Sequence, residues 1–203
     1  MKTEKFNKDY FENGIRKHLS GYEDYHWMPT RSISEAIDIS KAFNFTTCVD
    51  YGCAKGYLVH ALRILGYEAY GEDISHYALD ACHPNVRGFL SLPNENKYDL
   101  LIAKDILEHV EEKDLPELLD LFCSKADEFF FVIPLGDKDL FRIREYEVDI
   151  THVTKKDEEW WINMCGSRGL KLVDFSYSFG AVKEKWTGPY PHGNGFFTFK
   201  KLK

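Results

Sequence analysis

The sequence predicts an α/β fold, doubly wound around a mostly parallel sheet of seven strands. Segments with the pattern of a strand alternate with segments with the pattern of a helix along most of the chain. Two predicted strands, 99–103 and 129–133, are almost wholly apolar, as strands buried on both faces are. A glycine turn at 52–56 joins a strand to a helix. Together these observations favour one open sheet with helices on both faces.

Caps and apolar spacing place the elements of the first half of the chain. A short helix is predicted at 7–19, and Ser32 with Glu35 forms a capping box that opens a second helix. Apolar side chains at helical spacing predict a helix over 57–65, which Gly66 closes. The other elements expected here are strands near 47–49, 68–71 and 86–89 and a helix at 75–82.

The second half of the chain continues the alternation. Leucines and Phe122 on one side of 114–127 predict an amphipathic helix, and Pro134 stops the apolar strand that follows it. Thr154 and Asp157 are expected to cap a helix that ends near the glycines at 166 and 169. The remaining segments are an irregular insert at 135–153, strands at 170–178 and 196–200, and a loop rich in glycine, proline and aromatic residues at 179–195.

Composition and charge limit what the protein can be. Its 203 residues fit one domain at 32–203, preceded by an N-terminal lid or cap segment at 1–31. The net charge of −7 speaks against a nucleic-acid partner, because phosphate binding needs clustered Lys and Arg. Five scattered cysteines, no signal peptide and no long apolar run predict reduced thiols, a cytoplasmic location and no membrane partner. The sequence predicts no oligomeric state.

The glycine turn and the strands around it indicate an adenosine-binding site. Gly52 and Gly56 allow a sharp turn and close approach of a ligand, and the next helix aims free N–H groups at it. Asp73 follows the turn at about the 20-residue spacing of a ribose-binding acid. A dinucleotide site needs G-x-G-x-x-G, whereas Asp50 would repel a pyrophosphate and attract the amino group of a methionine moiety. The pattern therefore favours S-adenosylmethionine over NAD.

These residues resemble the class I S-adenosylmethionine-dependent methyltransferases over about residues 45–200. The segment 50–56 is similar to their first motif, with Ala54 where the middle glycine often stands, and 71–75 matches the ribose-binding second motif. The segment 88–93 is similar to the adenine-side segment, although Phe89 replaces the usual acid. The resemblance implies S-adenosylmethionine as cofactor and an antiparallel last strand. The cofactor-binding residues that it implies are Asp50, Gly52, Cys53, Gly56, Asp73, Ile74, Phe89, Leu90 and Lys104.

The residues after the strand at 99–103 form the candidate reaction centre. If a helical turn begins there, Asp105, Glu108 and His109 share one face at positions i, i+3 and i+4. His152 lies in the insert after the next strand, which ends at the same edge of the sheet. This set resembles the metal-dependent O-methyltransferases, in which such residues bind a divalent ion that holds the acceptor hydroxyl. Carboxylate and imidazole ligands suit Mg²⁺, Mn²⁺ or Fe²⁺.

A metal-free interpretation of the same residues stays open. Related sequences carry the Leu-Glu-His-Val segment at 107–110 without binding metal, and Asp105 can serve as a helix N-cap. His109 or His152 would then be the catalytic residue, as a general base, because an imidazole pKa near 6.5 suits that task.

A hydroxyl acceptor fits this cluster better than an amine, because its proton must be removed during methyl transfer. The insert at 145–154 and the two tryptophans that follow it are similar to methyltransferases of polysaccharide synthesis. The sequence thus predicts O-methylation of a small molecule or sugar, with 22–31 and 179–195 ordering as lids. The alternatives are an RNA ribose 2′-O-methyltransferase and a non-catalytic adenosine-binding module.

Overall fold

The main sheet of the computed structural model runs in the order β3-β2-β1-β4-β5-β9-β8, and β6 and β7 form a separate hairpin. The structure describes residues 3–202. Neighbouring strands are parallel from β3 to β5, whereas β9 is antiparallel to both β5 and β8. The predicted fold class is confirmed. The strands are β1 (Thr47–Tyr51), β2 (Glu68–Glu72), β3 (Leu90–Ser91), β4 (Leu100–Lys104), β5 (Glu128–Pro134), β6 (Gly136–Asp137), β7 (Leu140–Phe141), β8 (Leu170–Ser176) and β9 (Asn194–Lys201).

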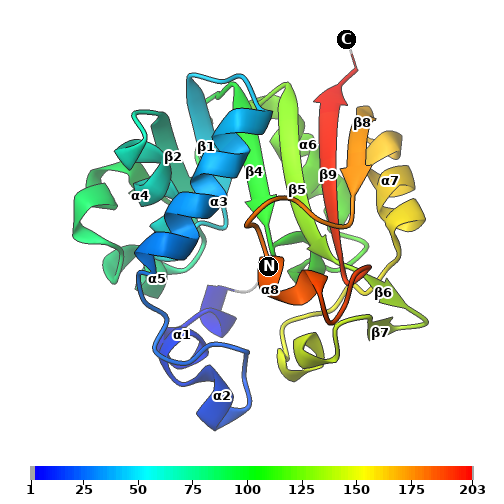
Figure 1. The fold of residues 1–203 in the computed structure, drawn as a ribbon, viewed down its shortest axis with the longest axis horizontal. Coiled ribbons are helices and arrows are strands. Elements are labelled where there is room, and N and C mark those ends of the chain that lie inside the picture. The colour runs from blue at the N-terminus through cyan, green and yellow to red at the C-terminus, as the bar shows by residue number, and fades with distance from the viewer. Residues whose placement is uncertain (1–2, 203) are drawn as a thin grey trace.

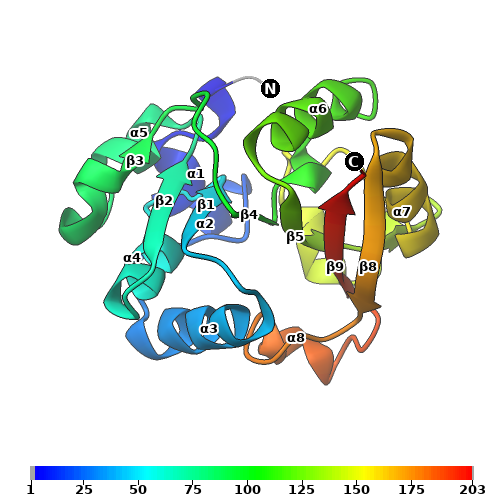
Figure 2. The same cartoon turned by 90° about the horizontal axis from the view of Figure 1, so that it is seen from above.

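Helices cover both faces of this sheet. In Figures 1 and 2, α3 and α4 lie on one face and α6 and α7 on the other, while α1, α2, α8 and the β6–β7 hairpin gather beyond the carboxyl end of β4. No helix within residues 3–202 is long and apolar enough to cross a membrane. The helices are α1 (Lys8–Glu12), α2 (Gly14–Lys17), α3 (Pro29–Ala42), α4 (Tyr57–Ile64), α5 (His76–Asp80), α6 (Leu115–Lys125), α7 (Glu158–Ser167) and α8 (Glu184–Thr187), with 3-10 turns η1 (Thr3–Lys5), η2 (Pro84–Phe89), η3 (Leu107–His109) and η4 (Arg144–Val148).

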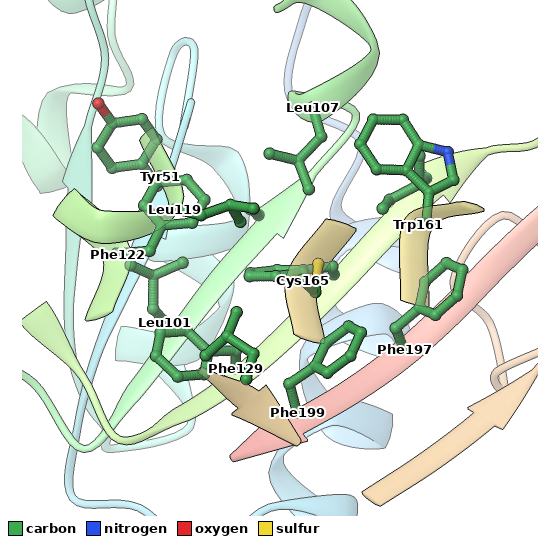
Figure 3. Close-up of a cluster of buried hydrophobic side chains, with 14 of the residues drawn as sticks. Tyr51, Leu101, Leu107, Leu119, Phe122, Phe129, Trp161, Cys165, Phe197 and Phe199 are labelled. Carbon is green, nitrogen blue, oxygen red and sulfur yellow. The ribbon is translucent and has the colours of Figure 1, made fainter. Parts of the chain in front are cut away.

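The core consists of two apolar layers, one on each face of the sheet. In β5, Phe129, Phe131 and Ile133 pack in the layer that contains residues of α6 and α7, which Figure 3 shows in part. Phe130 and Val132 of the same strand pack in the layer that contains residues of α3 and α4. This alternation follows from the period of two in a strand. The two layers hold the strands, and the loops that follow β1, β2 and β4 start from these buried strand ends.

Two predicted boundaries are wrong because a proline begins the element. Helix α3 begins at Pro29, so Ser32 lies inside the helix and the predicted capping box does not exist. Pro84 begins η2, and this turn occupies the residues predicted as a strand at 86–89; β3 follows it. Proline is favoured at the first helical position because its φ is fixed and its missing N–H is not needed there.

Other differences concern irregular segments. The helix predicted at 7–19 is two short helices, α1 and α2, which meet at Asn13. The insert at 135–153 contains the β6–β7 hairpin and η4. Asp157 alone caps α7, because its side chain accepts a backbone N–H at 2.8 Å, whereas the Thr154 hydroxyl donates to a carbonyl outside the helix. These short elements depend on long-range contacts that no local pattern reports.

Candidate active site

A cavity of about 150 Å³ lies at the carboxyl ends of β1, β2 and β4. One wall comes from the loops that follow these strands: Asp50, Gly52, Cys53, Ala54, Asp73, Ile74, Lys104, Asp105, Ile106 and His109. Much of the remaining wall comes from residues 6–28, which we call the N-terminal segment: Phe6, Tyr10, Phe11, Tyr22, Tyr25, His26 and Met28. The cavity thus combines polar groups from the sheet with an aromatic cover.

The turn after β1 depends on left-handed backbone conformations. Gly52 and Gly56 have φ values of 81° and 75°, which favour glycine. A Cβ atom on Gly52 would lie 1.8 Å from the side chain of Ile106, so the turn packs directly on the loop after β4. Ala54 also has a positive φ of 49°, and its N–H donates to the carboxylate of Asp73 at 2.7 Å. That charge-assisted bond offsets part of the strain at Ala54.

Two carboxylates face the cavity and differ in their partners. Asp73 accepts N–H groups from Ala54 and Ser75, each at 2.7 Å; burial raises its pKa, and these bonds oppose the shift. Asp50 is buried, and burial raises its pKa to about 7 although Lys104 acts in the opposite direction. A cationic group in the cavity would therefore stabilise the ionised form of Asp50.

Three residues predicted to bind the cofactor do not line the cavity. Gly56 packs instead against Leu90, whose Cδ1 would lie 2.7 Å from a Cβ atom at position 56. Leu90 therefore lies behind the turn. The ring of Phe89, in η2, packs under the guanidinium of Arg63, which lies 3.3 Å from the ring centroid. Phe89 and Leu90 thus lie outside the cavity lining, and their contacts with the cofactor stay a prediction.

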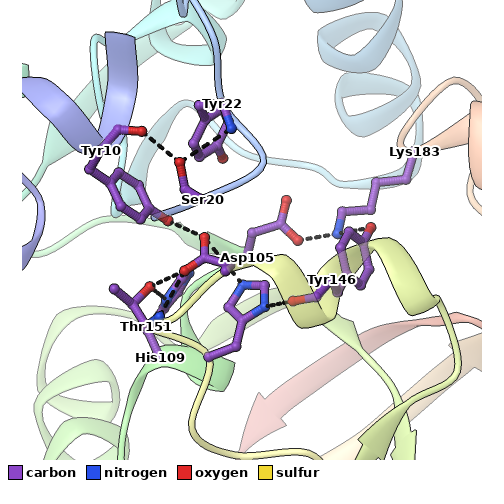
Figure 4. Close-up of polar contacts among 10 residues, drawn as sticks. Tyr10, Ser20, Tyr22, Asp105, His109, Tyr146, Thr151 and Lys183 are labelled. Carbon is purple, nitrogen blue, oxygen red and sulfur yellow. Dashed lines mark hydrogen bonds and ion pairs between the residues drawn. The ribbon is translucent and has the colours of Figure 1, made fainter. Parts of the chain in front are cut away.

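Asp105 does not share a helical face with Glu108 and His109, contrary to prediction. Its φ is 61°, and η3 begins two residues later, so no helical turn joins the three; nor is Asp105 the N-cap of η3. Its carboxylate instead forms an ion pair with Lys183, at the start of α8 (Figure 4), and lies 3.6 Å from Nζ of Lys104. Burial alone would raise its pKa, but Lys183 and Lys104 hold the pKa of Asp105 at about 2.

Glu108, His109 and His152 do converge. One ligating atom of each residue lies within 4.8 Å of those of the other two. Glu108 is fully buried, and its two carboxylate oxygens have no hydrogen-bond partner among residues 3–202. Burial, reinforced by the nearby Asp105 carboxylate, raises the pKa of Glu108 well above its usual range. Three of the four predicted metal ligands are thus brought together, and His109 also lines the cavity.

Both imidazoles are held through Nδ1. His152 Nδ1 lies 2.8 Å from the carbonyl oxygen of Tyr146; because a carbonyl only accepts, Nδ1 carries the hydrogen and Nε2 keeps a lone pair. His109 Nδ1 lies 2.7 Å from Oγ1 of Thr151. Burial lowers the pKa of His152, and burial with the neighbouring imidazole lowers that of His109 to about 4. Both rings are therefore neutral at pH 7, which is the form that binds a metal or accepts a proton.

Sequence reasoning missed the partners of these groups. Lys183 is buried, and its Nζ lies 2.9 Å from Oη of Tyr146 and 3.2 Å from Oδ1 of Asn194, which fixes the cation that pairs with Asp105. Nothing in the local pattern singles out Lys183. Thr151 did carry a signal, because a hydroxyl residue stands directly before one of the predicted histidines.

A comparison with protein families identifies the class to which this chain belongs. A family model described as "Methyltransferase domain" matches residues 25–174, which is most of the chain and includes the loops after β1, β2 and β4. The chain therefore belongs to the class I S-adenosylmethionine-dependent methyltransferases. A comparison with curated protein sequences gives no significant match.

Several solved structures share the fold at low sequence identity. The mitomycin 7-O-methyltransferase MmcR is 14% identical with a TM-score of 0.63, over 84% of this chain and 54% of that one, so this chain spans about half of MmcR. An S-adenosylmethionine-dependent methyltransferase from Archaeoglobus fulgidus is 17% identical with a TM-score of 0.62, over 84% and 94% of the two chains. The small RNA methyltransferase HEN1 is 15% identical with a TM-score of 0.63, over 86% of this chain and 25% of that one.

Proposed function

We propose that this enzyme transfers the methyl group of S-adenosylmethionine to a hydroxyl oxygen of a small molecule or sugar, assisted by a divalent cation. The observation that carries the proposal is the convergence of Glu108, His109 and His152, of which His109 lines the cavity at the carboxyl ends of β1, β2 and β4. A hydroxyl acceptor must lose its proton as the methyl group arrives, and this cluster supplies the groups for that step. The likeness to MmcR, an O-methyltransferase, supports the same reaction class.

The residues present fit a divalent cation. A fully buried carboxylate without a hydrogen-bond partner is costly, and a cation between Glu108 and two neutral imidazoles would remove that cost. Asp105 is paired with Lys183, so the candidate metal ligands are one carboxylate and two imidazoles instead of the predicted two carboxylates and two imidazoles. Imidazole-rich sites favour Mn²⁺ or Fe²⁺ over Mg²⁺. When bound, such a cation lowers the pKa of an acceptor hydroxyl.

The cavity also offers groups for each part of the cofactor. Each carboxylate oxygen of Asp73 uses one lone pair for a backbone N–H and keeps another for a ribose hydroxyl. Asp50, at the start of the glycine turn, would face the methionine amino group. Cys53, Ile74 and Lys104 complete this wall. The aromatic N-terminal segment would exclude water from the reacting atoms.

Three measurements test the proposal. Calorimetric titration with Mn²⁺ should show binding to the native protein, loss of at least ten-fold in affinity in Glu108→Gln, and no change in Glu111→Gln, whose carboxylate is exposed. A screen with labelled cofactor against sugars, nucleotide sugars, phenols and RNA should then give methylated hydroxyl products. A chelator should abolish turnover, and added Mn²⁺ should restore it.

The alternatives predict different outcomes. If chelation has no effect and His109→Ala lowers turnover by ~10²–10⁴, a metal-free general base replaces the cation and O-methylation stands. Methylation of RNA alone would overturn the small-molecule or sugar acceptor, and the likeness to HEN1 makes RNA a necessary arm of the screen. Cofactor binding without turnover on any acceptor would favour an adenosine-binding module.

A further inference from the structure

A chain of buried hydrogen bonds leads from the N-terminal segment to His109 (Figure 4). The hydroxyl of Tyr10 in α1 donates to Oδ2 of Asp149 at 2.7 Å. Oδ1 of the same carboxylate accepts the hydroxyl of Thr151 at 2.5 Å, and Thr151 Oγ1 lies 2.7 Å from Nδ1 of His109. Tyr10, Asp149 and Thr151 are 4%, 7% and 2% exposed, so water does not compete for these bonds.

The direction of these bonds determines where His109 carries its proton. A carboxylate only accepts, so the single hydroxyl hydrogen of Thr151 points to Asp149. Oγ1 of Thr151 is then an acceptor toward His109, and Nδ1 of His109 must be the donor. The other ring nitrogen, Nε2, keeps its lone pair. It is the lone pair that a base or a metal ligand needs.

The N-terminal segment supplies the far end of this chain. The ring of Phe6 packs edge-on against the His109 ring, with centroids 5.4 Å apart. The Leu19 carbonyl accepts from Ile150 N–H at 3.1 Å, and within the segment the Ser20 hydroxyl donates to the Tyr10 carbonyl at 2.6 Å. The segment that covers the cavity therefore also contacts the residues that orient His109.

We propose that Tyr10, Asp149 and Thr151 are positioning residues that hold His109 as the Nδ1–H tautomer, and that closure of the N-terminal segment completes this arrangement. The inference rests on the proposed function insofar as it assigns His109 a role in the reaction. Closure adds the Tyr10 donor to the carboxylate that orients Thr151, so covering the cavity and holding the His109 tautomer are coupled. When the segment opens, Tyr10 moves away and the Asp149 carboxylate loses the hydrogen bond from the Tyr10 hydroxyl.

The tautomer can be measured without knowing the acceptor. Long-range ¹H–¹⁵N correlation spectra at pH 7.5, with the His109 signals assigned by their loss in His109→Gln, should show a protonated Nδ1 and an unprotonated Nε2. Thr151→Val keeps the shape but removes the acceptor, and should shift His109 toward Nε2–H; Thr151→Ser should restore the native pattern. Tyr10→Phe should give a smaller shift and faster amide exchange in 8–17. Tyr22→Phe is the matched control, because the Tyr22 ring packs against Tyr10 but its hydroxyl is not part of the chain of hydrogen bonds to His109.

An unchanged His109 tautomer in Thr151→Val would overturn the positioning role. Native tautomer and native amide exchange in Tyr10→Phe would overturn the link to closure. As a second readout, Thr151→Val should weaken Mn²⁺ binding by roughly 10–100-fold, with recovery in Thr151→Ser. If the native protein binds no Mn²⁺, the metal part of the proposed function fails, while the tautomer result still decides the positioning role.

Discussion

Asp73 and Asp50 lie in one cavity, but the protein stabilises their charges differently. Asp73 is held by two backbone N–H donors, so its carboxylate is already oriented before any ligand arrives. Residues 3–202 offer Asp50 no comparable donor, and burial raises its pKa to about 7, which opposes ionisation. At the scale of residues, one acid is prepared to accept hydrogen bonds and the other to receive a positive charge.

Asp73→Ala should weaken binding of S-adenosylhomocysteine by one to two powers of ten. The substitution removes the acceptor of the ribose diol and leaves buried hydroxyls unpaired, which costs about 1–3 kcal/mol. Calorimetry measures the affinity, and Asp80→Ala, on exposed surface of α5, is the control. Native affinity in a folded Asp73→Ala protein would refute the ribose contact.

Asp50→Asn should stabilise the ligand-free protein while weakening cofactor binding. The pKa of Asp50 rises from 3.8 to about 7 on folding, so the folded state holds a proton that the unfolded state has lost between these values. The free energy of unfolding therefore falls as the pH rises from 3.8 to about 7. The destabilisation, up to about 4 kcal/mol, is complete above pH 7. Denaturation at pH 5 and pH 8 should show a larger gain for the variant at pH 8; equal gains would contradict the shift.

At the scale of elements, an ion pair and hydrogen bonds, together called the latch, join the N-terminal segment to the glycine turn. Nζ of Lys55, within the turn, lies 2.5 Å from Oε1 of Glu12 and 2.6 Å from the carbonyl oxygen of Tyr25. The hydroxyl of Tyr77 donates to the same Glu12 oxygen at 2.8 Å. The covered cavity of about 150 Å³ is smaller than the roughly 300–1,000 Å³ of typical ligand sites. We therefore expect the latch to open when the cofactor enters.

Lys55→Met should loosen the N-terminal segment without unfolding the sheet. The variant loses the ion pair with Glu12, so amide exchange should rise in 8–25. Binding of S-adenosylhomocysteine should slow amide exchange in these residues of the native protein but not of the variant. Hydrogen exchange measured by mass spectrometry reads both effects, with Lys8→Met, an exposed lysine of α1, as control. The loop at 179–195 is predicted to gain protection with the ligand as well. Equal protection of both segments with and without ligand would argue for static packing.

At the scale of the whole molecule, a buried ion pair joins the edge of the sheet to α6. Glu72 at the end of β2 and Lys125 at the end of α6 are both fully buried, with 2.9 Å between Nζ and Oε1. Alternation along the chain turns Glu72 toward α6 and leaves Asp73 for the cavity. The pair therefore supports the strand end from which the ribose-binding acid projects.

Lys125→Met should destabilise the protein by about 3–5 kcal/mol, because it leaves the Glu72 carboxylate buried and unpaired. The double variant Glu72→Gln/Lys125→Met should recover most of that loss, since no buried charge remains. Chemical denaturation measures the free energy of unfolding in both. If Lys125→Met is as stable as the native protein, Glu72 is solvated or protonated in the variant with no loss in the free energy of unfolding.

The sequence by itself determined the sheet and the glycine turn after β1. The alternation of elements gave the doubly wound class, and the spacing of Asp50, Gly52 and Asp73 placed three cavity residues correctly. These signals are local: strand period, helix spacing and positive φ at glycine act over a few residues, and each can be interpreted without knowing the rest of the fold. The place of His109 was also predictable, because it lies in the short connection that follows β4.

Only the tertiary structure decided which groups pair with one another. Asp105 faces Lys183 instead of Glu108 because its backbone turns to positive φ and α8 delivers a cation to it. Tyr10 reaches Asp149 across 139 residues. Buried charges and hydroxyls take whichever partner packing brings within hydrogen-bond distance, and that choice depends on long-range contacts that leave no pattern in the sequence.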